Sequence, residues 1–419
     1  MLPRLRNPLA LGAVVMLGLL AGLQYWLAAR RPISPWYQAG REFTVTSEAD
    51  QGPGSLREAI FAADSSDQRA KIVLRTSRIV LQSPLPPLVN PKGVIVEAGE
   101  ARPEIDASNI GFGPVFDVDA PNSVISGIAI RNAPEQAILV RADGFRLMKA
   151  SLAGCDVGLY AADGISNLVA ENSTFENNRI GIWLAASNAG VIVRDNQFKA
   201  HRDAGVWAVA GKQPAASTET RLELRGNHFE GDRLSIVLGN IPAVIEANEV
   251  VKAREAAIYL IGAGAVVRGN RVRNGAGIGI FAHTTEGTVI ENNELDHNQA
   301  LAMLVRSAQN NLVDRNRIYN NGYGIGFVLG QRGRPNIASD NTLLSQQFDG
   351  IILIGESPVL RGNRLVNNKL AGLRVLDFFP LIGNKVVADP FLADNILAGN
   401  KLNEPIRGEY RVQKSEKPQ

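Results

Sequence analysis

Short alternations of hydrophobic and polar residues recur along the chain, and each is centred on an asparagine in the same frame. Four of them are V-I-V-R-D-N-Q-F at 191–198, L-E-L-R-G-N-H-F at 222–229, V-V-R-G-N-R-V at 266–272 and V-L-R-G-N-R-L at 359–365. The position three residues before the asparagine is apolar, as is the position two residues after it. A period of two, broken by glycine and asparagine, is typical of β-strands.

The recurrent asparagine defines a repeat with steps of 21 to 31 residues. Its positions are Asn196, Asn227, Asn248, Asn270, Asn293, Asn316, Asn341, Asn363 and Asn384. A second apolar run follows in each repeat, such as G-I-W-L at 181–184 or A-I-Y-L at 257–260. One such unit cannot bury its apolar face alone, whereas stacked units form a continuous core, so we expect a solenoid of about 12 coils.

Two physical reasons would make asparagine recur at one position of each coil. Asparagine tolerates the left-handed backbone conformation of a tight bend. Its side-chain amide can also bond to the coils above and below, which would form an internal ladder through the whole stack.

The N-terminal region predicts a membrane segment followed by an end cap. Residues 9–29 are apolar and uncharged, long enough to span a bilayer, and longer than the apolar core of a secretory signal, so we expect residues 1–30 to be an uncleaved signal anchor. Residues 31–42 would be a linker. In G-P-G-S-L-R-E-A-I-F-A-A-D (52–64), Ser55 and Glu58 fit a capping box that opens an amphipathic helix. Such a helix would close the first coil of a β-helix at 43–403, with a polar tail at 404–419.

Charge and cysteine content exclude several classes of protein. The net charge is +3, but residues 1–41 hold five arginines and no acids, so the remainder carries 39 basic against 41 acidic residues. This balance does not predict the basic surface that a nucleic-acid-binding protein needs. Cys155 is the single cysteine, so no intrachain disulfide can form, and no spacing of cysteine and histidine indicates a metal site.

The outward positions of the second strand form a column that is apolar where the others are charged. It is expected to contain Asp117, Leu139, Tyr160, Trp183, Trp207, Val237, Tyr259, Gly279, Leu304, Gly326, Ile352 and Arg374. The aromatic members Tyr160, Trp183, Trp207 and Tyr259 would form a stripe of flat rings suited to the apolar faces of sugars. The alternative is that a loop, the linker or a partner subunit covers them.

These repeats resemble the right-handed parallel β-helix repeats of the pectin-lyase-like superfamily over roughly residues 90–400. The resemblance implies an all-β, single-stranded right-handed parallel β-helix. Residues 52–64 resemble the S-L-R-E-A segment found ahead of bacterial β-helix and adhesin-like domains. The superfamily includes polysaccharide lyases, polygalacturonases and mannuronan epimerases, but the chain has neither the D-P-H-D of the epimerases nor the Asp-Asp pair with G-H-G of polygalacturonases.

A lyase or a uronate C5-epimerase needs a base and a group that neutralises the sugar carboxylate. His201 or Arg233 would be that base, and Asp203 with Asp232 would bind Ca²⁺ or supply an acid. These residues flank Trp207 in the bend before the second strand, beside an inserted loop at 211–220. The alternative is that they are solvated surface charges.

The sequence therefore supports two functions. The first is an extracytoplasmic protein, anchored in a bacterial inner membrane by one helix with its bulk in the periplasm, that binds or also modifies an exopolysaccharide or cell-envelope polysaccharide. The second is a non-catalytic scaffold or adhesin-like surface protein. No cofactor is expected unless the site is catalytic, when Ca²⁺ would serve, and no protein partner is indicated.

Overall fold

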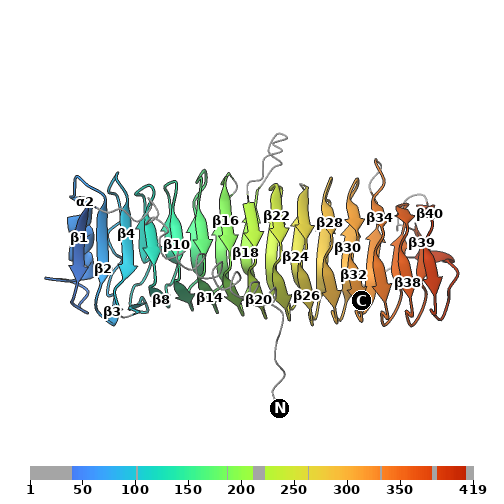
Figure 1. The fold of residues 1–419 in the computed structure, drawn as a ribbon, viewed down its shortest axis with the longest axis horizontal. Helices are drawn as coiled ribbons and strands as arrows, with labels where there is room; N and C mark the ends of the chain where they lie inside the picture. Colours follow the sequence, from blue (N-terminus) through green and yellow to red (C-terminus); the bar gives the residue numbers. More distant parts are fainter. Residues whose placement is uncertain are drawn as a thin grey trace, which may run out of the picture.

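The chain winds into a solenoid with three long parallel sheets along its sides, and most coils contribute one strand to each sheet (Figure 1). The computed structural model describes residues 40–411 apart from 101, 186, 211–221, 263, 331–332 and 380–384. The coils follow one another in sequence order along the long axis, from α2 (Leu56–Asp64) and β1 (Arg41–Val45) at one end to β39 (Leu373–Phe379) and β40 (Phe391–Ala393) at the other (Figure 1).

Sheet A contains fifteen strands, in the order β1, β2 (Ala70–Leu74), β4 (Val94–Ala98), β7 (Val124–Ser126), β10 (Arg146–Met148), β13 (Val169–Glu171), β16 (Val191–Arg194), β19 (Leu222–Arg225), β22 (Ala243–Glu246), β25 (Ala265–Arg268), β28 (Val289–Glu291), β31 (Leu312–Asp314), β34 (Ile337–Ser339), β37 (Val359–Arg361) and β40. Sheet B contains fourteen, in the order β3 (Arg78–Val80), β5 (Glu104–Asp106), β8 (Ala129–Arg131), β11 (Ser151–Ala153), β14 (Thr174–Glu176), β17 (Gln197–Lys199), β20 (His228–Glu230), β23 (Glu249–Val251), β26 (Arg271–Arg273), β29 (Glu294–Asp296), β32 (Arg317–Tyr319), β35 (Thr342–Leu344), β38 (Arg364–Val366) and β41 (Ile396–Ala398). Sheet C contains thirteen, in the order β6 (Phe116–Val118), β9 (Gln136–Val140), β12 (Val157–Ala161), β15 (Ile180–Leu184), β18 (Ala204–Val209), β21 (Leu234–Gly239), β24 (Ala256–Ile261), β27 (Ile278–His283), β30 (Leu301–Arg306), β33 (Tyr323–Val328), β36 (Ile351–Ile354), β39 and β42 (Ile406–Arg411).

The solenoid is slightly longer than the sequence indicated. It has about thirteen turns, judged by the 13 strands of sheet C, rather than about 12. The first half of the expected polar tail at 404–419 forms β42, which pairs with β39. The predicted anchor at 1–30 and most of the linker at 31–42 lie outside the described residues, and among the residues that are described no helix has both the length and the apolarity to cross a membrane.

Stacking in register fills the interior with columns of like residues. Phe175, Phe198 and Phe229 lie on successive strands of sheet B, with ring centroids 4.9 and 4.6 Å apart and planes tilted by 6° and 8°. All three are fully buried. Because parallel coils place equivalent side chains about 4.8 Å apart, flat rings stack face to face without any adjustment of the backbone.

The predicted N-terminal helix is present as α2. Ser55 is its N-cap and accepts a hydrogen bond from the backbone N–H of Glu58 at 3.2 Å, while the Glu58 carboxylate accepts from the N–H of Gly54 rather than from that of Ser55. The helix buries Leu56, Ala59, Ile60 and Ala63 in the core beside the first two strands of sheet A.

The predicted asparagine ladder lies between sheets A and B and joins each coil to the next. The side-chain Oδ1 of Asn270 accepts from the backbone N–H of Asn248 at 2.9 Å, and the Nδ2 of Asn270 donates to the carbonyl of Ile245 at 2.8 Å. The same bonds run from Asn196 to Asn363. The predicted ninth member, Asn384, lies outside the described residues, and Asn395 takes the next position, with its Oδ1 3.0 Å from the N of Asn363.

The left-handed bend residue is not the ladder asparagine but the residue before it. Positive φ angles occur at Asp195, Gly226, Ala247, Gly269, Asn292, Arg315, Asp340, Gly362 and Asp394, whereas no ladder asparagine has one. The backbone explanation for the recurrent asparagine was therefore wrong, and hydrogen bonding of the buried amide explains it.

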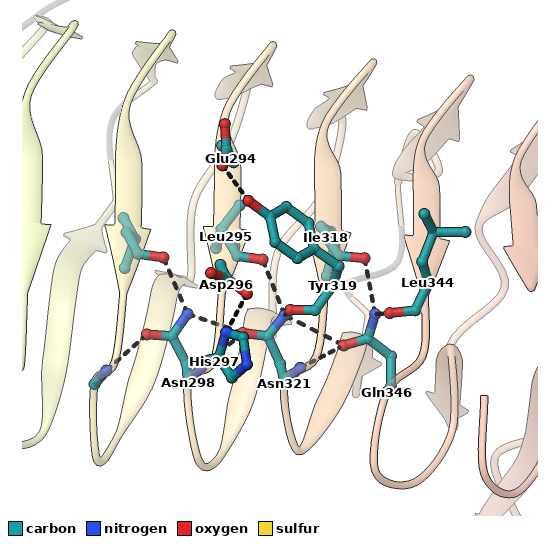
Figure 2. A network of polar contacts seen from close by, with 12 residues as sticks. Glu294, Leu295, Asp296, His297, Asn298, Ile318, Tyr319, Asn321, Leu344 and Gln346 are labelled. Atoms are coloured by element: carbon teal, nitrogen blue, oxygen red, sulfur yellow. Dashed lines mark hydrogen bonds and ion pairs between the residues drawn. The ribbon is translucent and has the colours of Figure 1, made fainter. Parts of the chain in front are cut away.

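A second internal ladder, which the sequence did not reveal, lies between sheets B and C. Figure 2 shows part of it: the N–H of Asn298 donates to Oδ1 of Asn321 at 2.9 Å, and the N–H of Asn321 donates to Oε1 of Gln346 at 3.0 Å. Its positions hold different residue types in successive coils, namely Cys155, Asn178, His201, Asp232, Ala253, Gly275, Asn298, Asn321, Gln346, Asn368 and Asn400. This variety hid the column from a search for one repeated residue.

A third, shorter set of buried polar groups lies at the bend that follows sheet C. The N–H of Asn311 donates to Oδ1 of Asn336 at 3.1 Å, and Nδ2 of Asn336 donates to Oε1 of Glu356 at 3.3 Å. Burial raises the pKa of Glu356 to about 7, and the hydrogen bond from Asn336 lowers it by less.

Replacing Asn270 by alanine should strongly destabilise the fold. The change leaves the buried N–H and amide of Asn248 without their acceptor, at a cost of about 3 kcal/mol. Chemical denaturation followed by circular dichroism measures it. Arg271→Ala is the matched control, since Arg271 is exposed and makes an ionic contact with Glu294 at 3.5 Å. This variant should change the free energy of unfolding by less than about 0.5 kcal/mol. Equal losses in the two variants would contradict a special role for the ladder.

Glu356→Gln should remove a pH-dependent penalty. Because the pKa of Glu356 is raised to about 7, the folded state holds a proton that the unfolded chain releases near its usual pKa of 4.5, so stability falls as pH rises through this window. Glutamine keeps the acceptor for Asn336, and the variant should be more stable than the parent by up to about 3 kcal/mol at about pH 8 and equally stable at about pH 4. Thermal unfolding at the two pH values tests this. A gain that is the same at both would refute the assignment, and Glu286→Gln, at an exposed bend position, is the control.

Candidate functional site

An aromatic row lies on the outer face of sheet C. In β15 the side chains of Ile182 and Leu184 are buried and Trp183 between them is half-buried, which is the alternation of a strand with one face to the core. Trp183 pairs in register with Tyr160 on one side and with Trp207 on the other. The predicted outward direction of these three rings is therefore confirmed.

The row continues beyond the residues that the sequence indicated. Tyr259 pairs with Phe281, not with Gly279, and the two rings stack with centroids 4.8 Å apart and planes 11° apart. A shift of two residues preserves the in-and-out alternation of a strand, so the hydrophobic pattern alone could not distinguish the two registers. Val237, which pairs with both Trp207 and Tyr259, is 1% exposed and divides the row into two groups of rings.

A row of alternating charges runs beside the aromatic rings, in the bends that lead into sheet C. Arg179 makes two bonds to the Asp156 carboxylate, at 2.7 and 2.8 Å, and one to Asp203 at 3.3 Å. Arg233 bonds to Glu255 at 2.7 Å and lies 4.0 Å from Asp203. The order over five coils is thus Asp156, Arg179, Asp203, Arg233 and Glu255, which we call the charged row.

Arg179 contacts both the carboxylates of the charged row and the aromatic row. The hydrogen bonds from Arg179 hold the pKa of Asp156 below its usual range, and the bond to Asp156 raises the pKa of Arg179 in turn. The guanidinium carbon of Arg179 also lies 5.7 Å from the centroid of the Trp183 ring, within the range of a cation–π contact.

A shallow cavity of about 250 Å³ opens between the two rows. Its lining consists of Arg179, Ile180, Trp183, Asp203, Trp207, Arg233 and Leu234. The structure thus brings together four of the predicted site residues, Trp183, Trp207, Asp203 and Arg233. Tyr160 and Tyr259 lie on the same face of sheet C in coils to either side, and the inserted loop at 211–220 lies outside the described residues.

His201 and Asp232, both predicted as catalytic, lie inside the solenoid. Their side chains are 0% exposed, and His201 Nδ1 is 2.7 Å from Asp232 Oδ1, which also accepts from the backbone N–H of His201 at 2.9 Å. They occupy two positions of the second internal ladder, between Asn178 and Ala253. A side chain that solvent cannot reach cannot exchange a proton with a polymer on the surface, so this correction leaves them a structural role. The predicted Ca²⁺ pair of Asp203 with Asp232 is not formed, because Asp203 faces outward and is 39% exposed.

The described lining of the cavity holds one carboxylate and two guanidinium groups. Glycoside hydrolysis uses two carboxylates at the reacting bond, and of the described residues that line the cavity Asp203 alone supplies one. Across residues 40–411, with the gaps given above, no group of three or more histidine, cysteine or acidic residues is placed to hold a metal ion. The lining thus combines aromatic rings with hydrogen-bond donors and acceptors.

Comparison with known proteins identifies the fold. The chain is similar to the catalytic unit of the GH87 α-1,3-glucanase from Streptomyces thermodiastaticus strain HF3-3 (TM-score 0.57, 16% identity, 87% of this chain and 69% of that one). It is also similar to the Dettilon tailspike protein (0.47, 16%, 79% and 66%) and to a GH87 α-1,3-glucanase catalytic domain in complex with tetrasaccharides (0.47, 10%, 88% and 68%). At 16% sequence identity, the first likeness shows a shared fold and nothing about function.

A known protein family matches more than half of the chain. No curated protein matches the chain. The family described as "Right handed beta helix region" matches residues 93–218 and 215–370, which leaves the S-L-R-E-A segment at 52–64 outside the match. These matches span more than half of the chain and coincide with the three-sheet coils described above, so the protein belongs to the right-handed β-helix family, with the pectin-lyase-like fold.

Proposed function

We propose that the protein binds a polysaccharide along the outer face of sheet C. The observation that carries the proposal is the cavity between Trp183 and Trp207, with Arg179, Asp203 and Arg233 on its rim. Aromatic rings offer a flat apolar surface to the C–H face of a sugar, while carboxylates and guanidinium groups bond to hydroxyls.

The regular spacing of the coils supports binding of a polymer rather than a single sugar. Rings on successive coils lie one strand spacing apart, about 4.8 Å, and they continue past Val237 to Tyr259 and Phe281. A chain of sugars lying along the solenoid axis would therefore meet ring after ring. Large exposed or half-exposed rings in a chain with 6% aromatic residues are best explained by such a ligand.

We place the β-helix outside the cytoplasm, held at the inner membrane by residues 9–29. The support is the uncharged apolar run in the sequence, together with the extracytoplasmic position of most polysaccharides that a surface row of this kind could meet.

Binding without catalysis is the form of the function that we favour. Asp203, the one carboxylate among the described residues that line the cavity, is held between two arginines, and the histidine nearest in sequence, His201, is buried. This also keeps open a display or adhesion role in which the bound glycan is the surface that the protein attaches to.

Trp183→Ala and Trp207→Ala should each weaken retention on a polysaccharide matrix by about tenfold, because each removes one ring of the platform. Pull-down with insoluble polysaccharides measures retention. Circular dichroism should show no loss of fold, since both rings lie on the outer face. Phe112→Ala is the matched control, because Phe112 is 72% exposed and lies in the bend before β6, three coils from Trp183. Unchanged retention in both tryptophan variants would remove the platform.

The protein should release no unsaturated uronate from alginate or polygalacturonate, with or without Ca²⁺, because the part of the cavity lining that the structure describes offers no free base. Ultraviolet absorbance of the products and NMR of the recovered polymer measure elimination and epimerisation. Turnover that Asp203→Asn abolishes would overturn the non-catalytic form of the proposal while leaving binding in place.

A further inference from the structure

The charges around the cavity indicate which class of polysaccharide it can accept. The bends that lead into β9, β12, β15, β18, β21 and β24 carry five carboxylates and five cationic groups. They are Glu135, Asp156, Asp203, Asp232 and Glu255, and Arg179, Arg202, Arg233, Lys252 and Arg254. The formal sum is 5 − 5 = 0. A surface that had been built for an acidic polymer would carry an excess of positive charge.

The guanidinium groups also have partners already. Arg179 is bonded to Asp156 and Asp203, and Arg233 to Glu255. Nη2 of Arg254 donates to the carbonyl of His201 at 2.8 Å. Arg202 lies near enough to Asp156 for its charge to lower the pKa of that carboxyl.

A uronate polymer would have to compete for these arginines. A sugar carboxylate that took the two-bond contact of Arg179 or the bond of Arg233 would displace a protein carboxylate, so one ion pair would be exchanged for another with no gain. A sugar carboxylate that used only a remaining N–H group would bond to a guanidinium whose charge a protein carboxylate already balances. It would also approach Asp203, which lies between the two arginines and lines the cavity. The negative charges of the sugar carboxylate and of Asp203 would repel each other inside the cavity.

A neutral sugar meets no such conflict. Its hydroxyl groups can donate to the Asp203 carboxylate and accept from the remaining N–H groups of Arg179 and Arg233 without breaking an ion pair. The rings of Trp183 and Trp207 need only an apolar sugar face, which a neutral hexose offers.

We infer that the site accepts a neutral polysaccharide and discriminates against polyuronates, and that Asp156 and Glu255 enforce this choice by occupying the arginines from outside the cavity. The inference rests on the proposed binding of a polysaccharide and adds its chemical class.

The first experiment compares retention of the protein on neutral and anionic matrices at one ionic strength. The probes are insoluble α-1,3-glucan, β-1,3-glucan and cellulose on one side, and calcium alginate and cross-linked polygalacturonate on the other. We expect retention on at least one neutral matrix to exceed that on both polyuronates by about tenfold or more. Retention on the neutral matrix should hardly change with added NaCl, because no net charge is involved.

The second experiment frees the arginines. Glu255→Gln leaves Arg233 without its 2.7 Å partner, and Asp156→Asn does the same for the two bonds of Arg179. Each variant should raise retention on polyuronates by roughly 2- to 5-fold relative to the neutral matrix, and the increase should disappear at high salt. Glu171→Gln is the matched control, since Glu171 pairs with Arg194 on the outer face of sheet A, and its ratio should stay at the parent value.

The outcomes separate the two proposals. Stronger and salt-sensitive retention of the parent protein on a polyuronate would overturn the neutral class while leaving polysaccharide binding intact. Parent-like ratios in both Glu255→Gln and Asp156→Asn would show that these carboxylates do not control the choice. Retention on none of the matrices would overturn the proposed function itself.

Discussion

Every coil of the solenoid is joined to the next by hydrogen bonds that lie inside it as well as along its sheets. An amide such as that of Asn270 is surrounded by apolar residues and would be costly to bury alone, but the same amide in the neighbouring coils supplies its donors and acceptors. A shift of one coil against the next by a single residue would leave the ladder amides unpaired at that junction. The ladders therefore fix the register of the stack, and the alignment of every outer column depends on that register.

The close contact between coils also restricts what may stand at the start of each strand of sheet C. A Cβ atom on Gly181 would lie 2.5 Å from the carbonyl oxygen of Gly205 and 2.9 Å from Nε2 of His201. Only glycine fits there, which explains why G-I-W-L and G-V-W-A repeat immediately before the two tryptophans. Gly181, which leaves room for the buried histidine, and the half-buried Trp183 on the outer face are thus two positions apart in the same strand.

The three outer faces then acquire different properties from the residues that register brings together. Sheets A and B present cross-coil ion pairs, such as Arg225 with Glu246 at 2.7 Å and Arg273 with Glu249 at 2.6 Å. Exposed pairs of this kind contribute little stability each and keep the surface soluble. Sheet C instead presents rings along its strands and paired charges in its bends. The candidate site needs no special loop, because it arises where these two columns run side by side.

The sequence alone determined the fold class, the frame of the first ladder and the outward direction of Trp183, because all three follow from a period of two and a repeat near 22 residues. It could not show that His201 and Asp232 belong to the second ladder, because a histidine and an aspartate in neighbouring bends are also typical of a catalytic site. Only the path of the backbone through these bends turns the two side chains inward. It could not choose between Gly279 and Phe281, because both registers satisfy the same alternation. The partners of Arg179 and Arg233 come from coils 22 to 30 residues away, so the charge balance of the cavity was decided by the tertiary stacking and by nothing local in the chain.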